Sequence, residues 1–193
     1  MIKKKTWIMM LLLFATILLF TGVASAQEQD TEKQIENNKT LLILGCAIAV
    51  GISGISAATG LTFSGSAAVA VAAEKPNVGS KLIVLQVLPM TQSVYGLLTA
   101  ILMLMGSGLL GGSAKAAMTD PVIGPATIFI GLVVALTSTS AINQGILASS
   151  SISAVGRNPD VFTKGVIYTV TTETMAIFGL LTAIFIMVGL KLL

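Results

Sequence analysis

Hydrophobic residues occur along this chain in four long runs, and nearly all of the charge lies before, between and after them. The runs cover about residues 41–73, 82–110, 121–155 and 165–190. Each run is long enough to cross a hydrocarbon core of about 30 Å as a helix, which takes roughly 20 apolar residues. The pattern therefore predicts an all-α membrane protein with four spanning helices.

Short polar connectors divide these runs into two helical hairpins. The connectors at residues 74–81 and 157–164 each join two runs that we expect to be antiparallel neighbours. The predicted units are a transmembrane hairpin 1 at residues 41–110, a linker at 111–120 and a transmembrane hairpin 2 at 121–193.

The N-terminal segment, residues 1–26, has the form of a secretory signal peptide. Three lysines precede an apolar stretch, which ends in the small-residue site Ala24-Ser25-Ala26. We predict cleavage after Ala26, which leaves residues 27–40 as a polar tail outside the cytoplasm. The alternative is an uncleaved signal anchor that adds a fifth helix. In both cases the connectors inside the two hairpins face the cytoplasm, and their basic residues agree weakly with the positive-inside bias.

The two hairpins are copies of one sequence. At an offset of 83 residues Pro76 aligns with Pro159, and the segment 96–101 (GLLTAI) is identical to the segment 179–184. The chain is therefore a duplicated two-helix unit, and a short hairpin with no polar interior of its own is a natural subunit of a larger ring. Helices one and three are rich in glycine, alanine and serine, which fits close helix packing in a ring or in a monomeric bundle.

Composition and charge exclude several classes of function. A mean hydropathy of +0.94 and 54% hydrophobic residues are too apolar for a soluble globular domain. Without residues 1–26 the basic and acidic residues are equal in number, so nothing indicates a nucleic-acid partner. The chain has no histidine, and the glycines from Gly106 to Gly112 are not followed by the Lys-Ser/Thr of a phosphate-binding loop. We predict neither an ATP site nor a bound cofactor.

Glu173 is the candidate functional residue. It is the only charged residue between Lys164 and Lys191, and nine residues of helix place it about 13 Å from Lys164, near the middle of the membrane. A charge at that depth costs about 2.5–3.5 kcal/mol on translocon scales, so we expect the carboxyl to be protonated or to hold a cation. The equivalent position in hairpin 1 is Met90, so only one of the two hairpins carries an ionisable group at this position.

Polar residues of two other helices reach a similar depth. Thr91 and Gln92 lie about 15–17 Å beyond the last lysine before helix two, and Tyr95 follows one turn later. Pro89 cannot donate a backbone hydrogen bond, so we expect a kink that frees carbonyl oxygens. On helix three, Gln144 can approach the same level. These groups together form an oxygen-only site suited to a hard cation. A proton would need fewer ligands, and hydrogen bonding between helices is the alternative role for the hydroxyl and amide groups.

At these residues the chain resembles the proteolipid subunit of the rotary V/A-type ATPase ring, in the duplicated four-helix form whose second hairpin alone keeps the carboxylate. The specific part is LQVLPMTQSVYG at residues 85–96 together with ETMAI at 173–177, and the resemblance covers residues 41–193. It implies a non-catalytic, ion-translocating subunit in a homo-oligomeric ring. The implied partners are a stator subunit, central-stalk subunits and membrane lipid, in a multi-pass protein of a prokaryotic cell membrane.

In sodium-translocating members, the resemblance implies a set of oxygen ligands and one hydrogen-bonding tyrosine. The implied residues are the carbonyl of Leu88, the side chains of Thr91, Gln92, Gln144 and Glu173, and Tyr95, which hydrogen-bonds the carboxylate. Met90 is a departure, because a glycine can follow the proline in sodium-binding relatives and a larger side chain would crowd the site. Proton-using relatives usually lack the complete polar set, so sodium is favoured over protons. The alternatives are a stand-alone channel or secondary transporter that uses Glu173 as a proton relay, and a structural protein in which Glu173 only joins helices.

Overall fold

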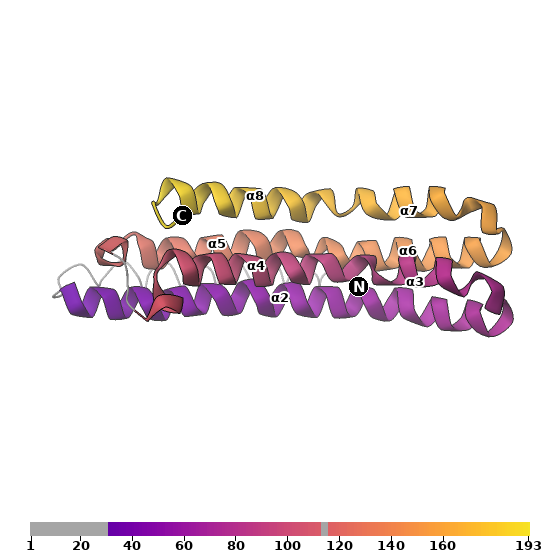
Figure 1. Ribbon diagram of the computed structural model, residues 1–193, viewed down its shortest axis with the longest axis horizontal. Helices are drawn as coiled ribbons and strands as arrows, with labels where there is room; N and C mark the ends of the chain where they lie inside the picture. The colour runs from indigo at the N-terminus through magenta and orange to yellow at the C-terminus, as the bar shows by residue number, and fades with distance from the viewer. Residues whose placement is uncertain (1–30, 113–115) are drawn as a thin grey trace, which may run out of the picture.

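The computed structural model describes residues 31–112 and 116–193, and these residues form a bundle of long helices (Figure 1). Four spans are long and apolar enough to cross a membrane, and they are Glu32–Glu74, Pro76–Gly106, Ile123–Arg157 and Pro159–Gly189. The spans confirm the predicted all-α, four-helix membrane fold. The predicted signal peptide and its cleavage site lie outside the described residues.

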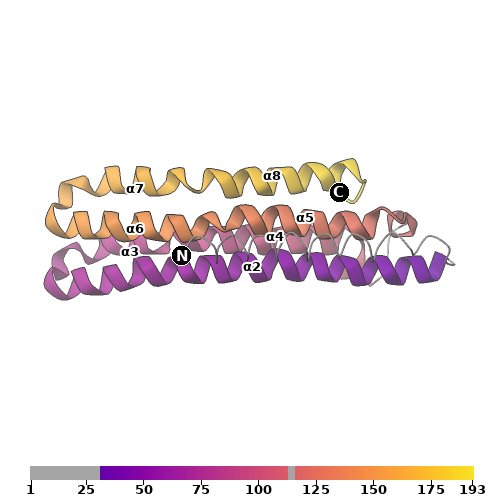
Figure 2. The same ribbon diagram turned by 180° about the vertical axis from the view of Figure 1, so that it is seen from behind.

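Within the bundle the four spans lie side by side along one axis. The tight turns of both hairpins are at one end, and the linker and the C-terminus are at the other (Figures 1 and 2). The third span lies between the first and the fourth, in both views. Hairpin 2 therefore packs on hairpin 1 mainly through its first helix.

The first span is one continuous helix, α2 (Thr31–Glu74), whereas the other three are interrupted near the middle. The interrupted spans consist of α3 (Gly79–Val87) and α4 (Thr91–Gly106), α5 (Ile123–Ser138) and α6 (Ser140–Arg157), and α7 (Phe162–Thr171) and α8 (Thr174–Gly189). Short 3-10 turns complete the described chain at η1 (Pro76–Val78), η2 (Leu88–Met90), η3 (Leu109–Gly111), η4 (Ala116–Thr119) and η5 (Pro159–Val161).

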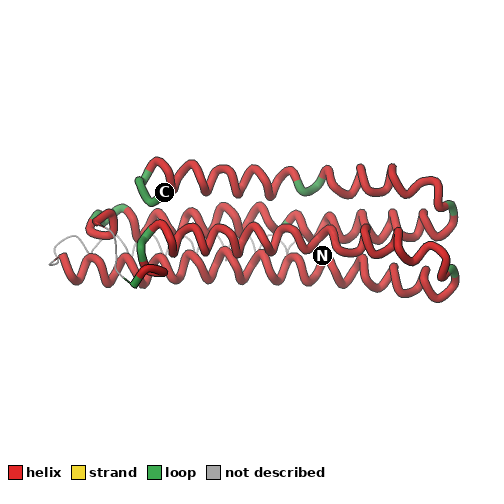
Figure 3. The backbone as a smooth tube through the Cα atoms, viewed as in Figure 1, coloured by secondary structure: helices red, strands yellow, loops and turns green. Residues whose placement is uncertain are grey.

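The three interruptions have different causes. In the second span η2 contains Pro89, which lacks the N–H needed to continue the α-helical ladder, so the predicted disruption at this proline is confirmed. The third span breaks at Thr139 and the fourth at residues 172–173, both without a proline. The break between α7 and α8 is drawn as a non-helical stretch in Figure 3. Neither of these two breaks was predicted from the sequence.

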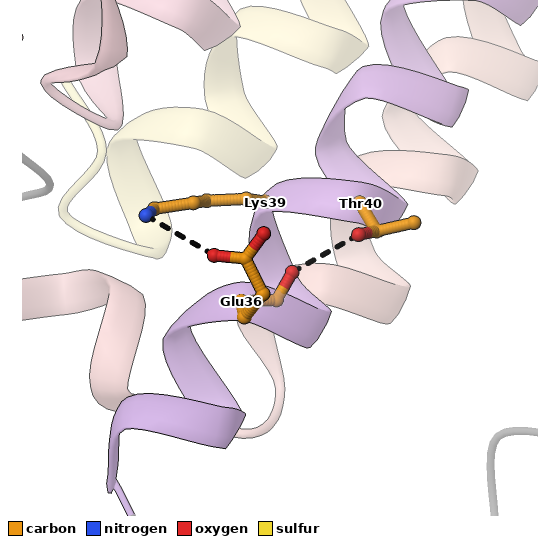
Figure 4. Close-up of polar contacts among 3 residues, drawn as sticks. All are labelled: Glu36, Lys39 and Thr40. Atoms are coloured by element: carbon orange, nitrogen blue, oxygen red, sulfur yellow. Dashed lines mark hydrogen bonds and ion pairs between the residues drawn. The ribbon is translucent and has the colours of Figure 1, made fainter.

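Helix α2 starts ten residues before the first apolar run. Most of the polar segment at 27–40 is therefore helical where the structure describes it. On its exposed side Lys39 Nζ lies 3.3 Å from Glu36 Oε2, and the Thr40 hydroxyl donates to the Glu36 carbonyl at 3.1 Å (Figure 4). A helix pair three residues apart contributes about 0.2–0.5 kcal/mol.

The buried side of this extension holds the linker between the hairpins. Asn38 is fully buried, and its Nδ2 donates to the carbonyls of Met118 at 2.9 Å and Asp120 at 2.8 Å. Its Oδ1 accepts from the backbone N–H of Gly124 at 3.1 Å. One side chain of α2 therefore satisfies three backbone groups around the start of α5, which fixes hairpin 2 against hairpin 1.

Helices α2 and α5–α6 touch backbone to backbone. A Cβ atom on Gly131 would overlap the carbonyl of Gly45, and a Cβ atom on Gly145 would overlap the backbone of Gly60. Small residues allow such close approach where lipid supplies little hydrophobic driving force between helices. Two glycine pairs, Gly45 with Gly131 and Gly60 with Gly145, therefore pack against each other within one chain, whereas a Cβ atom on Gly51 or Gly54 would meet nothing within 4 Å.

Two hydrophobic clusters fill the ends of the bundle. Near the linker, Leu42, Met103 and Met187 belong to a fully buried group. Near the hairpin turns, Leu85 and Ile152 belong to another. The interrupted middle of the bundle lies between these clusters, so polar groups placed there are screened from water on both sides.

Candidate ion-binding site

The break at Pro89 sets the geometry of the second span. The Thr91 hydroxyl donates to the carbonyl of Leu88 at 3.0 Å, across the 3-10 turn η2. Gln92, the next residue, is fully buried. Met90 is 49% exposed on the outside of the subunit, so within one chain its side chain does not crowd these polar groups.

A pair of buried glutamines joins the two hairpins. Gln92 Nε2 on α4 donates to Gln144 Oε1 on α6 at 2.8 Å, and both side chains are fully buried. This bond leaves Gln92 Oε1 and Gln144 Nε2 without a hydrogen-bonding partner among the described residues. An unpaired buried polar atom costs about 1–3 kcal/mol. The Gln92 oxygen is therefore available to coordinate a cation or to accept a hydrogen bond.

Glu173 is connected to the other hairpin by a short hydrogen bond. It precedes the first residue of α8, at the break in the fourth span, and is 9% exposed. The Tyr95 hydroxyl on α4 donates to Glu173 Oε1 at 2.6 Å. This bond ties the carboxyl group of hairpin 2 directly to a side chain of hairpin 1.

The structure thus places the six sequence-predicted site residues in three bonded pairs. The segment from Leu88 to Tyr95 contributes to every pair: Thr91 bonds Leu88 within it, while Gln92 and Tyr95 reach Gln144 and Glu173 in hairpin 2. Neither hairpin carries the site alone. Asn143 is exposed, whereas its neighbour Gln144 is buried.

The chemistry of these groups suits a monovalent cation. Within residues 31–112 and 116–193 no group of three or more His, Cys, Asp or Glu side chains could hold a metal ion. Glu173 supplies one negative charge, and the other groups are neutral oxygens of a carbonyl, a hydroxyl and carboxamides, which hard cations prefer. One carboxylate neutralises one Na⁺ or H⁺, whereas a divalent ion would leave a net charge in lipid.

Sequence reasoning missed the residues that hold this site together. Gly60 of α2 has no room for a side chain, because a Cβ atom there would overlap the carbonyl of Ala141 and crowd Pro89. Gly145, beside Gln144, is pressed against Gly60 in the same way. The richness of helices one and three in small residues pointed to close packing, but it did not show that one of the backbone contacts lies beside Gln144.

The fold and the site define a class of membrane protein. Its chain contains two copies of a helical hairpin, and the mid-membrane carboxylate of the second hairpin is hydrogen-bonded to the first. The family model for the C subunit of ATP synthase matches the chain twice, over residues 44–103 and 127–186, once in each hairpin. The chain belongs to this family, and the resemblance to the duplicated proteolipid is confirmed.

Two curated relatives support the same conclusion. The chain is 38% identical over 147 residues to the A-type ATP synthase subunit K of Methanocaldococcus jannaschii, an alignment that covers 76% of this chain and 61% of the relative. It is 33% identical over 140 residues to the V-type sodium ATPase subunit K of Enterococcus hirae, with 71% and 83% covered. The chain thus spans about three fifths of the length of the first relative.

Proposed function

We propose that this chain is a rotor-ring subunit of a V/A-type ATPase that carries Na⁺ across the membrane on Glu173. The observation that carries the proposal is the bond from Tyr95 to Glu173, which holds the buried carboxylate of hairpin 2 against the polar segment of hairpin 1. Family membership and the sodium ATPase relative support it.

Five groups would supply the oxygens for sodium. The proposed ligands are the Leu88 carbonyl, the Thr91 hydroxyl, the carboxamide oxygens of Gln92 and Gln144, and the carboxylate of Glu173. Gln92 Oε1 has no other partner among the described residues, and Gln144 Oε1 keeps a lone pair after accepting from Gln92. Tyr95 would orient the carboxylate without binding the ion itself.

The transport mechanism follows from the charge of the site. With Na⁺ bound, Glu173 and the ion sum to zero, so the loaded site can turn through lipid. An empty, ionised carboxylate at that depth costs about 2.5–3.5 kcal/mol, which opposes rotation until the site is filled. A membrane potential of 100 mV contributes about 2.3 kcal/mol per ion moved. Loading and unloading therefore take place where partner subunits give the site access to water.

Identical subunits and a stator are the partners this mechanism needs. Large apolar side chains such as Ile55, Val69 and Phe185 are mostly exposed on the single chain, in positions suited to lipid or to neighbouring subunits. Central-stalk subunits would attach at the cytoplasmic hairpin turns, with the N-terminus on the opposite side of the membrane.

Carbodiimide labelling of Glu173 in membranes tests the proposal. The reagent attacks a protonated carboxyl in lipid, so a bound Na⁺ should protect the residue. We expect millimolar NaCl to slow labelling while equal KCl does not, and Glu173→Gln to remove the label. Labelling that depends on pH but not on sodium would show that the site carries protons. Ion flux through liposomes containing this chain alone would instead show a self-contained channel.

A further inference from the structure

Two of the three hydroxyl groups at the break between α5 and α6 differ from those elsewhere in the helices. Serine and threonine hydroxyls in the described helices commonly donate to a carbonyl three or four residues earlier, as Ser150 does to Ile146 at 3.2 Å. Ser138 and Ser140 flank the break at Thr139, and their buried Oγ atoms have no partner among the described residues.

The break accounts for the missing bond from Ser140 to the carbonyl four residues earlier. The carbonyl four residues before it is that of Leu136. This oxygen already accepts from the backbone N–H of Thr139 at 3.2 Å and from the Thr139 hydroxyl at 2.7 Å. The Ser140 hydroxyl is thereby left available to a group other than its own helix.

The nearest group of suitable chemistry on α6 is the amide of Gln144. Ser140 and Gln144 are four residues apart within α6, so they lie on the same face of the helix with Cβ atoms about 5–6 Å apart. Gln144 Nε2 also lacks a partner among the described residues, and the side chain is fully buried. Ser140 Oγ and Gln144 Nε2 are thus two buried atoms without partners on one helix face, and one water between them would satisfy both, since a buried water needs two to four polar partners.

We propose that Ser140 is a positioning residue of the ion site, which holds the Gln144 amide through one bound water. Anchored at Nε2, the amide keeps Oε1 directed at Gln92 and at the ion. Without this hydrogen bond, the Gln144 amide group can rotate and direct its N–H₂ group at the ion, which repels a cation. This inference rests on the proposed sodium function and extends it to a residue that contacts no ion.

The test compares the NaCl concentration that half-protects Glu173 from carbodiimide in rings of different variants. Ser140→Ala should raise this concentration about three- to tenfold, the loss expected for one hydrogen-bonded link. Ser140→Thr keeps the hydroxyl and should restore a value near wild type. Ser150→Ala is the matched control, because its hydroxyl on the same helix bonds to Ile146 of its own helix. The rate of labelling without sodium and the thermal midpoint of the ring should stay at wild type in all three variants.

Each outcome has a separate meaning. An unchanged sodium midpoint in Ser140→Ala overturns the assignment while leaving the sodium site intact. A parallel fall in thermal midpoint and in sodium protection, which Ser140→Thr does not reverse, shows a packing role and also overturns it. Wild-type rings that sodium does not protect refute the sodium function, and the Ser140 assignment fails with it.

Discussion

The contact between Gly145 and Gly60 gives the sharpest test of how packing controls the site. Replacing Gly145 with alanine adds a single Cβ, which would overlap the backbone of Gly60. Backbone cannot rotate away as a side chain can, so we take the upper end of the overpacking range, about 3 kcal/mol. Alanine is more favourable than glycine in a helix by about 1 kcal/mol, so the net loss of stability is about 2 kcal/mol.

This loss can be measured as a change in thermal stability. At about 2–4 °C per kcal/mol for a chain of this size, the midpoint should fall by about 4–8 °C. Circular dichroism of the purified ring in detergent gives the midpoint. Because α6 must move away from α2, Gln144 also shifts relative to Gln92, so more sodium should be needed to protect Glu173.

The matched control for this variant is Gly65→Ala on α2. A Cβ atom there lies 3.7 Å from Gln86 Nε2, an ordinary contact, so stability should stay level or rise by up to about 1 kcal/mol. If Gly145→Ala and Gly65→Ala melt at the same temperature and bind sodium alike, the backbone contact does not hold the site and the reasoning is refuted.

Three further variants test other contacts. Tyr95→Phe removes the 2.6 Å bond to Glu173 and should raise the sodium concentration for half-protection about tenfold or more, whereas an unchanged value would show that the hydroxyl is dispensable. Glu173→Asp keeps the charge but shortens the side chain by one methylene, so labelling should persist while sodium protection weakens; full protection would contradict the proposed ligand geometry. Asn38→Leu removes three hydrogen bonds to backbone groups of the linker region and should cost about 2 kcal/mol in a thermal melt, with no change in sodium protection. Its control is Thr40→Val, because the Thr40 hydroxyl bonds only to a carbonyl of its own helix.

The broad architecture was predictable because bilayer thickness dictates it. Four apolar runs of sufficient length permit little besides four helices, and the missing N–H of Pro89 fixes one break. The constant rise of a helix placed Gln92 and Glu173 at similar depths, and the structure bonds Tyr95, one turn after Gln92, to Glu173, while Gln92 itself bonds Gln144 on the third span.

The remaining features depend on contacts that a single sequence does not display. The breaks at Thr139 and at residues 172–173 contain no proline. The residues there are threonine and glutamate, and neither of these forces a helix to end. The helical extension of α2 through its polar start is held by Asn38, whose partners lie about 80 residues later. The proposed role of Ser140 could not be predicted from the sequence, because it depends on the hydroxyl having no hydrogen-bonding partner within its own helix.

Met90, where the repeat would place a second carboxylate, has a consequence for gearing. In a ring built from this chain, each set of four helices holds one ion, so a given circumference moves half as many ions per turn as a ring with a carboxylate in every hairpin. The work of one turn is then divided among fewer charges, and each ion can be driven against a steeper gradient. Under the proposed rotor function, a methionine at this position would lower the number of ions moved per turn, and with it the transport rate, while raising the gradient that the complex could sustain.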